Sequence, residues 1–253
     1  LLVDKNPKSA IAESFRSVRT NLQFISNKED AKVIAITSTI SGEGKTFVAI
    51  NLAGVIAFSD KKVIILDLDM RKPKIHLGFN VDNVKGMSTI LIGKDKIENC
   101  IQQSNLKNLH FITAGPIPPN PSELILSKAM NDTVQFLKTV YDVVIIDTPP
   151  VGIVTDGVQI IKSADFPIYI IRAMYSKRMF INNINKLIDE TKREIRKSKR
   201  KDYYKILELH SNASQEQIKK QFKKRTENSW TTLLHNKFLY FYAYLNFLSN
   251  LKC

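Results

Sequence analysis

The chain has 253 residues, of which 43% are hydrophobic and 25% charged, and it carries a formal net charge of +14. A chain of this length and composition can bury a sizeable core, so these values exclude wholesale disorder. Its two cysteines cannot form a disulfide scaffold, and they indicate a reducing compartment. No run of residues approaches the roughly 18 apolar residues that a membrane-spanning helix needs.

The positive charge is concentrated towards the end of the chain. Residues 191–253 carry 15 basic and 5 acidic side chains, whereas residues 1–190 carry 23 and 19. All nine glycines lie at or before Gly157, and all nine prolines at or before Pro167. Because glycine and proline, the usual turn residues, are absent after Pro167, the kind of structure should change in the later part of the chain. We predict a domain over residues 1–189 and a basic, helical C-terminal tail over residues 190–253.

Short apolar runs alternate with helical patterns in the first part. Runs of this kind are typical of parallel strands that are covered on both faces. The predicted strands are Ala31–Thr37, Lys62–Asp67, Asn108–Thr113, Tyr141–Asp147 and Phe166–Arg172. Helical stretches at Val48–Phe58 and Pro121–Val140 supply crossovers between them. We therefore predict an α/β domain with a doubly wound, mostly parallel sheet, in which ligands bind at the carboxyl ends of the strands.

The first predicted strand leads into a glycine-containing loop that passes directly into a helix. Gly42 and Gly44 allow backbone N–H groups to approach a polyphosphate, and the helix N-terminus adds a favourable dipole. After Glu43, Lys45 would neutralise phosphate charge, and the Thr46 hydroxyl would bind Mg²⁺. The alternative is a strand-to-helix turn that binds nothing. The strand before the loop and the helix after it favour a P-loop NTPase fold that binds a nucleotide with Mg²⁺.

Carboxylates stand at the ends of two further predicted strands. Asp67 and Asp69 lie two residues apart and are followed by Arg71, whereas Asp147 follows four apolar residues. A single aspartate in the latter position is the expected Mg²⁺ anchor of P-loop NTPases. Each carboxylate alone is a weak signal, because aspartates also cap helices. Since parallel strands end at one edge of the sheet, we expect these carboxylates to meet the phosphate loop.

Five motifs in the same order resemble the cytoplasmic catalytic domain of the bacterial tyrosine kinases that control capsular and exopolysaccharide export. The resemblance covers residues 1 to about 188. The motifs are an E-x2-R-x2-R helix (Glu13–Arg19), a Walker A loop (Gly42–Thr46), a Walker A′ motif (Val63–Arg71), a Pro-Asn-Pro-x-Glu-Leu segment (Gly115–Leu124) and a Walker B motif (Ile145–Pro150).

The resemblance implies transfer of the γ-phosphoryl group of ATP to tyrosine. It implies that Asp67 is the catalytic carboxylate, near the attacking tyrosine hydroxyl and the metal, and that Asp69 assists at the metal. Asp147 would face Mg²⁺ through water, and Arg71 would steady a phosphate or pair with an acidic neighbour. The residues that it assigns to ATP and Mg²⁺ in the Walker A loop are Gly42, Glu43, Gly44, Lys45 and Thr46.

The resemblance also implies partners. In the family, residues equivalent to Glu13, Arg16 and Arg19 mediate ring assembly; the alternative is a solvated helix face, because charge pairs at i, i+3 are ordinary. We expect a homo-oligomer whose partner is a membrane-anchored activator or polysaccharide co-polymerase, as a separate chain or an upstream segment. The expected location is the cytoplasm, peripheral at the inner face of the plasma membrane. A nucleic-acid partner is not expected.

A second hypothesis comes from the partitioning ATPases of the ParA and MinD type, which are nucleotide-switched binding proteins. They share the predicted fold and the proline after Walker B. Their phosphate loop begins Lys-Gly-Gly, however, and this chain has Ile40 and Ser41 where the first Lys and Gly would fall. They also lack the paired Walker A′ aspartates followed by arginine, so both features favour the kinase.

The end of the chain departs from the kinase pattern. The family adds another apolar strand and a tyrosine cluster, whereas residues 190–201 are strongly basic. We therefore expect the sheet to lack that strand and to expose an edge. Tyr203 and Tyr204 are candidate phosphoacceptors. The apolar context of residues 238–248, which include Tyr242 and Tyr244, indicates a packed helix or strand, or an aggregation-prone end, instead of a substrate loop.

Residues 201–225 resemble the first half of a J-domain, namely its helix I and its basic helix II. The His-Pro-Asp tripeptide that stimulates Hsp70 is absent from the sequence, which contains no His-Pro pair. We therefore expect no working co-chaperone and no Hsp70 partner. The alternative is a basic amphipathic helical tail.

Overall fold

The computed structural model describes residues 2–25, 32–152, 156–182, 184–185 and 242–244. Contacts divide the chain into two units, residues 1–176 with 240–253, and residues 177–239. The helices and strands named below belong to the first unit. None of the helices in the described ranges combines the length and the apolar character that crossing a membrane requires.

Within these residues the strands form one sheet in the order β3-β4-β2-β5-β1-β6-β7. Neighbouring strands are parallel, except that β3 is antiparallel to β4. The bounds are β1 Lys32–Ser38, β2 Val63–Asp67, β3 Gln102–Gln103, β4 Leu109–Ile112, β5 Val143–Asp147, β6 Phe166–Ile171 and β7 Tyr242–Tyr244. The predicted mostly parallel α/β sheet is thus confirmed.

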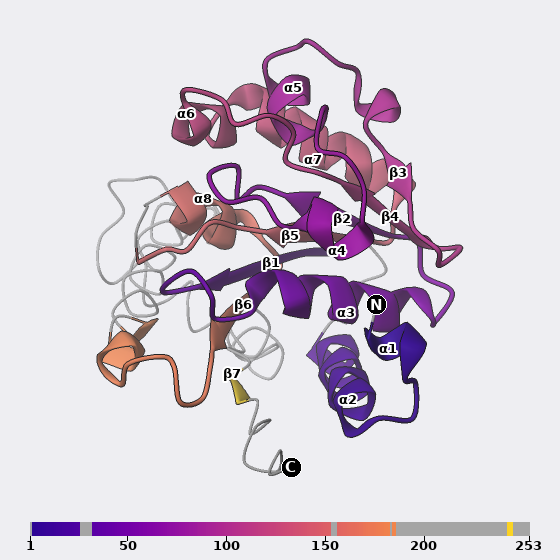
Figure 1. Cartoon of the computed structure of the whole chain (residues 1–253), viewed down its shortest axis with the longest axis vertical. Coiled ribbons are helices and arrows are strands. Elements are labelled where there is room, and N and C mark those ends of the chain that lie inside the picture. The colour runs from indigo at the N-terminus through magenta and orange to yellow at the C-terminus, as the bar shows by residue number, and fades with distance from the viewer. Residues whose placement is uncertain (1, 26–31, 153–155, 183, 186–241, 245–253) are drawn as a thin grey trace, which may run out of the picture. The chain divides into compact units, whose positions relative to one another are not determined.

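Helices cover both faces of the sheet (Figure 1). Helix α3 lies on one face with α1 and α2, and α5, α6, α7 and α8 lie on the other. The bounds are α1 Leu2–Lys5, α2 Ala10–Ile25, α3 Lys45–Ala57, α4 Ile75–Phe79, α5 Met87–Leu91, the 3-10 helix η1 Ile97–Asn99, α6 Pro121–Ile125, α7 Lys128–Val140 and α8 Asp156–Ser163.

The continuous apolar character of the central strands follows from this double cover. In β2, Val63 and Ile65 pack with α3, whereas Ile64 and Leu66 pack on the opposite face. All five residues of β2 are buried. Burial of a Val, Leu or Ile side chain contributes about 1.5–3 kcal/mol, so the central strands hold the layers together. The same strands carry Asp67 and Asp147 at their carboxyl ends.

The helix predicted at Pro121–Val140 is two helices. Helix α6 ends at Ile125, and α7 begins at Lys128. Ser127 has an extended backbone conformation, and its hydroxyl accepts a hydrogen bond from Met130 N at 3.2 Å. A serine in this role caps the start of a new helix, which explains why one apolar period contains a break.

The expectation of an uncovered sheet edge beside β6 is wrong. Strand β7 pairs in parallel with β6, with Tyr169 opposite Tyr242 and Ile171 opposite Tyr244. The apolar tyrosine tract therefore supplies a strand, as its context indicated. The predicted boundary at residue 190, Tyr203, Tyr204 and the J-domain-like stretch lie outside the described residues.

Candidate active site

The phosphate-type loop joins β1 to α3. Gly42 has φ +91° and Gly44, the residue before α3, has φ +100°. Glycine adopts this left-handed backbone without the penalty that a Cβ imposes. Lys45 and Thr46 open α3, and the Lys45 residue is only 5% exposed. The loop thus places a lysine and a hydroxyl at the N-terminus of a buried helix.

Thr46 contacts the carboxylate at the end of the neighbouring strand β5. Its hydroxyl donates a 2.6 Å hydrogen bond to Oδ2 of Asp147. The other oxygen, Asp147 Oδ1, is buried and has no hydrogen-bond partner among the described residues. A buried, unpaired carboxylate oxygen is costly and calls for a ligand that completes it.

The backbone that follows β2 orients Asp67. Its Oδ2 accepts hydrogen bonds from the N–H groups of Lys74 at 3.1 Å and Ile75 at 3.0 Å, and its Oδ1 accepts one from Asp69 N at 3.1 Å. Strand pairing sets Asp67 directly beside Asp147. Oδ1 of Asp69 accepts a hydrogen bond from Lys72 N at 3.3 Å. The expected meeting of carboxylates at one edge is therefore observed.

Burial dominates the electrostatics of these carboxylates. It raises the pKa of Asp147 to about 7, although the Thr46 hydrogen bond and the Lys45 charge act in the opposite direction. Burial, followed by the charge of Asp147, raises the pKa of Asp67 well above its ordinary value. Burial also raises the pKa of Asp69, against the charge of Lys45. Because burial disfavours the charged form of these carboxyls, a bound cation would stabilise that form.

A second segment, to which the sequence assigned no role in the site, contacts the loop. Arg172 Nη1 donates to the Gly42 carbonyl oxygen at 3.0 Å, and the Tyr175 hydroxyl donates to that of Ser41 at 3.1 Å. The guanidinium of Arg172 also lies 5.1 Å from the centroid of the Tyr175 ring. These residues belong to the turn after β6, so the turn holds the outer surface of the loop.

We call the contacts between the turn after β6 and the phosphate loop the brace. Glu43 is its acidic residue on the loop side. It is 3% exposed, its Oε2 accepts a 2.8 Å hydrogen bond from Ile40 N, and its Oε1 accepts one from the Ser176 hydroxyl. The hydroxyls of Thr39 and Tyr169 are hydrogen-bonded at 2.6 Å. Partners about 130 residues apart carry no signal in residue spacing, which is why sequence reasoning missed them.

Arg71 connects the Walker A′ turn to the Pro-Asn-Pro segment. Its Nη2 donates a 2.8 Å hydrogen bond to Oγ of Ser122, in the first turn of α6. This contact places the two motifs side by side. The predicted contact of Arg71 with a phosphate stays a prediction.

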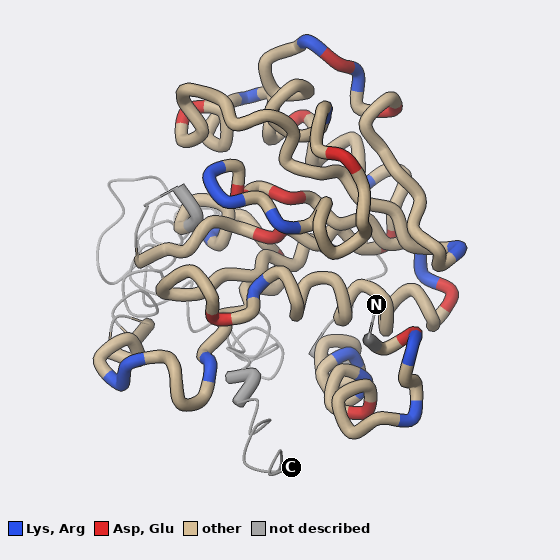
Figure 2. Tube along the Cα trace, viewed as in Figure 1, with Lys and Arg blue, Asp and Glu red and all other residues tan. Residues whose placement is uncertain are grey.

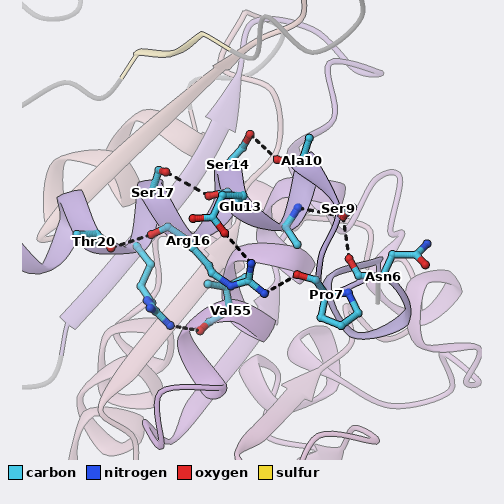
Figure 3. A network of polar contacts seen from close by, with 12 residues as sticks. Asn6, Pro7, Ser9, Ala10, Glu13, Ser14, Arg16, Ser17, Thr20 and Val55 are labelled. Atoms are coloured by element: carbon cyan, nitrogen blue, oxygen red, sulfur yellow. Dashed lines mark hydrogen bonds and ion pairs between the residues drawn. The ribbon is translucent and has the colours of Figure 1, made fainter. Parts of the chain in front are cut away.

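Glu13, Arg16 and Arg19 all lie on α2, and Figure 3 shows Glu13 and Arg16 in contact. Arg16 Nη1 pairs with Glu13 Oε2 at 2.8 Å, and its Nη2 donates to the Pro7 carbonyl oxygen at 2.5 Å. Arg19 Nη1 donates at 3.1 Å to the carbonyl oxygen of Val55, near the end of α3 opposite Lys45. These contacts join α2 to its neighbours within the domain.

Comparison with known proteins gives the family. Residues 31–201 match the family described as an AAA domain. The chain is 42% identical over 165 residues to tyrosine-protein kinase YwqD of Bacillus subtilis strain 168. The aligned region covers 65% of this chain and 70% of that protein.

Two solved structures agree with this match. The chimerical protein CapA2B2 superposes with a TM-score of 0.71 and 38% identity, over 76% of this chain and 84% of the other. The kinase domain of the Escherichia coli tyrosine kinase ETK superposes with a TM-score of 0.70 and 33% identity, over 76% and 74%. The chain therefore belongs to the family of bacterial tyrosine-protein kinases, on a P-loop NTPase fold.

Proposed function

We propose that this chain is an ATP- and Mg²⁺-dependent protein-tyrosine kinase related to those of capsular and exopolysaccharide synthesis. The observation that carries the proposal is the pair Thr46 and Asp147 beside the phosphate loop, with a buried Asp147 oxygen that lacks a partner. Asp67 lies beside this pair on the next strand. A phosphate cradle, a metal anchor and a carboxylate thus share one edge of the sheet.

The residues present fit a nucleotide with its metal. Backbone N–H groups of residues 42–46 and the Lys45 ammonium would hold the phosphates. Thr46 Oγ1 and Asp147 Oδ1 would hold Mg²⁺, with Asp69 close by. No three His, Cys, Asp or Glu side chains in the described part of the chain form a metal cage. Mg²⁺ commonly needs only one or two carboxylates, because phosphates and waters complete its shell.

When bound, Mg²⁺ neutralises phosphate charge and favours the ionised form of the carboxyls. Asp67 would then orient the acceptor tyrosine and accept its proton as the tyrosine oxygen bonds to the γ-phosphorus, while the bond from that phosphorus to the β–γ bridging oxygen breaks and ADP leaves. Three backbone N–H groups restrain Asp67, so its carboxylate keeps one orientation. Arg71, held by Ser122, would contact phosphate from the same side.

The proposal includes the assembly. We place the catalytic domain at residues 1–189 and treat residues 190–253 as a tail that contains the candidate acceptors Tyr203 and Tyr204. Glu13, Arg16 and Arg19 would contact a neighbouring copy. A membrane-anchored activator or polysaccharide co-polymerase would hold the domain at the inner face of the plasma membrane. The relatedness to the tyrosine kinases above supports this part.

The test compares phosphotyrosine formation and nucleotide binding in matched variants. Asp67→Asn keeps the shape of the side chain but removes the proton acceptor, so phosphotyrosine should fall by about 10²–10⁴-fold while nucleotide binding persists. Lys45→Ala should abolish nucleotide binding. Asp132→Asn, on the exposed surface of α7, is the matched control. ATP hydrolysis by the wild type without phosphotyrosine would favour the ParA/MinD-type switch instead.

A further inference from the structure

A turn with three basic residues follows the paired aspartates. The residues Arg71, Lys72 and Lys74 are exposed. The backbone N–H of Lys72 donates to Asp69, and that of Lys74 donates to Asp67. The loop that follows β2 therefore brings the backbone of basic residues next to the site carboxylates, and Figure 2 shows basic and acidic positions close together along this part of the trace.

The charges of the two lysines are not taken up by ion pairs within the described residues. The ion pairs found there join Arg16 to Glu13 and Lys61 to Asp142. Both lysines favour the ionised form of Asp69 but lie more than 4.0 Å from any described carboxylate oxygen. Glu123 follows Ser122, the residue that Arg71 contacts, and its carboxylate accepts a hydrogen bond from the Asn120 amide at 2.6 Å. The turn therefore presents net positive charge.

The strand order shows on which side of the site this charge lies. The strands β1, β5 and β2 are neighbours in this order. The phosphate loop follows β1, Asp147 ends β5, and the turn with the three basic residues follows β2. Asp147 thus lies between the phosphate loop and the turn. Because phosphoryl transfer is in line, the acceptor approaches the γ-phosphate from the side opposite its leaving group. The turn lies on the side of Asp67, the carboxylate proposed to receive the acceptor proton.

We propose that Arg71, Lys72 and Lys74 form a basic rim that selects acceptor tyrosines flanked by acidic residues. This inference rests on the proposed kinase function and names its substrate class. Complementary charge speeds encounter and suppresses partners of like charge. The chain's own segment around Tyr203 and Tyr204 contains Lys201 and Lys205 with a single acidic residue, Asp202. The rim therefore favours an acidic tyrosine segment on another chain over the candidate acceptors Tyr203 and Tyr204, whose flanking residues carry net positive charge.

The test uses three tyrosine peptides of equal length, with four flanking residues that are all Glu, all Gln or all Lys. For the wild-type full chain, kcat/KM should rank Glu above Gln above Lys, with a spread of roughly 10-fold or more at low salt. Screening at about 0.2 M salt should compress this spread. The double variant Lys72→Glu/Lys74→Glu should invert the ranking. The matched control is Lys94→Glu/Lys96→Glu, with the same charge change and spacing at exposed positions after α5; it should keep the wild-type ranking.

Binding of fluorescent versions of the same peptides, with Tyr replaced by Phe, is measured in parallel by anisotropy. A ranking that survives charge reversal at Lys72 and Lys74, or an equal loss for all three peptides, would overturn the rim. Charge-ranked binding without any phosphotyrosine would uphold the rim and contradict the proposed kinase function. Phosphotyrosine without a charge ranking in either assay would do the reverse.

Discussion

Asp147 ends the central strand β5, where helices cover both faces of the sheet and the residue is 0% exposed. One of its oxygens is hydrogen-bonded to Thr46, and the other is an unpaired buried acceptor among the described residues. Such a group is expensive for a protein without its ligand, because a buried charge is poorly solvated. The buried carboxylate of Asp147 therefore lowers the stability of the free protein, although the same group would bind a cation.

The pH dependence of stability should show this opposition. The pKa of Asp147 lies at about 7 in the folded protein, against an ordinary value of 3.8. Between these values the folded protein binds a proton that the unfolded chain has released, so the free energy of unfolding falls as pH rises through this window. Asp147→Asn should therefore stabilise the Mg²⁺-free protein at pH 8 and have little effect at pH 4.

Urea unfolding of both proteins at pH 4, 6 and 8 measures the difference in the free energy of unfolding. In thermal unfolding, each kcal/mol of that difference should shift the Tm by roughly 2–4 °C. Asp132→Asn serves as the surface control. A stability difference that is the same at every pH would assign the effect to packing, and would contradict the titration of a buried carboxyl.

At the scale of elements, the turn after β6 acts on the phosphate loop after β1. Strands β1 and β6 are hydrogen-bonded neighbours, so their carboxyl-terminal loops lie side by side. Arg172 and Tyr175 hold backbone carbonyl oxygens of the loop, while Ser176 holds Glu43. The brace restrains the loop before any phosphate arrives, which lowers the ordering cost of binding.

Glu43→Gln should weaken this brace. The amide retains the size of the side chain but loses the charged acceptor for Ile40 N and Ser176, and hydrogen bonds to charged groups are worth about 1.5–3 kcal/mol. We expect KM for ATP to rise by roughly 10-fold or more, with a smaller change in kcat, because in the proposed function the loop holds the nucleotide and takes no part in proton transfer.

Ser176→Ala provides the graded comparison for Glu43→Gln, since it removes one of the two hydrogen bonds. Steady-state kinetics at saturating acceptor, combined with direct titration of ADP, separate affinity from turnover. An unchanged ADP affinity in both variants would show that the loop keeps its shape without the brace.

At the scale of the whole molecule, β7 links the end of the chain to a sheet made by the first two thirds of it. Residues 242–244 pair with β6, which is also the strand that carries the brace. An unpaired edge strand exposes N–H and C=O groups to other chains. The tract therefore protects the side of the sheet that is next to the phosphate loop.

Deletion of residues 240–253 should lower the Tm and promote self-association. The variant Ala243→Pro tests the pairing itself, because proline removes a backbone donor and is tolerated poorly within a strand. Differential scanning fluorimetry and light scattering at several protein concentrations report both effects. Equal melting and equal scattering for the deletion, Ala243→Pro and wild-type proteins would show that β7 contributes nothing to the edge.

Local patterns were sufficient for most of the sheet and for the phosphate loop. Continuous apolar runs marked β1, β2, β5 and β6 to within a residue or two, because strands buried on both faces leave no polar alternation. The loop from Gly42 to Thr46 was visible because its chemistry lies in five consecutive residues. The break between α6 and α7 was missed, since a serine cap at Ser127 interrupts the helix without interrupting its apolar period.

The sequence by itself determined the strands, the loop and the carboxylates at the strand ends, since each depends on neighbours within a few residues. Only the tertiary structure decided that Asp67 lies beside Asp147 and that the turn after β6 holds Glu43. These relations depend on strand order, which joins positions up to about 130 residues apart. The physical reason is that parallel pairing brings remote strand ends to one edge, a proximity that residue spacing does not encode.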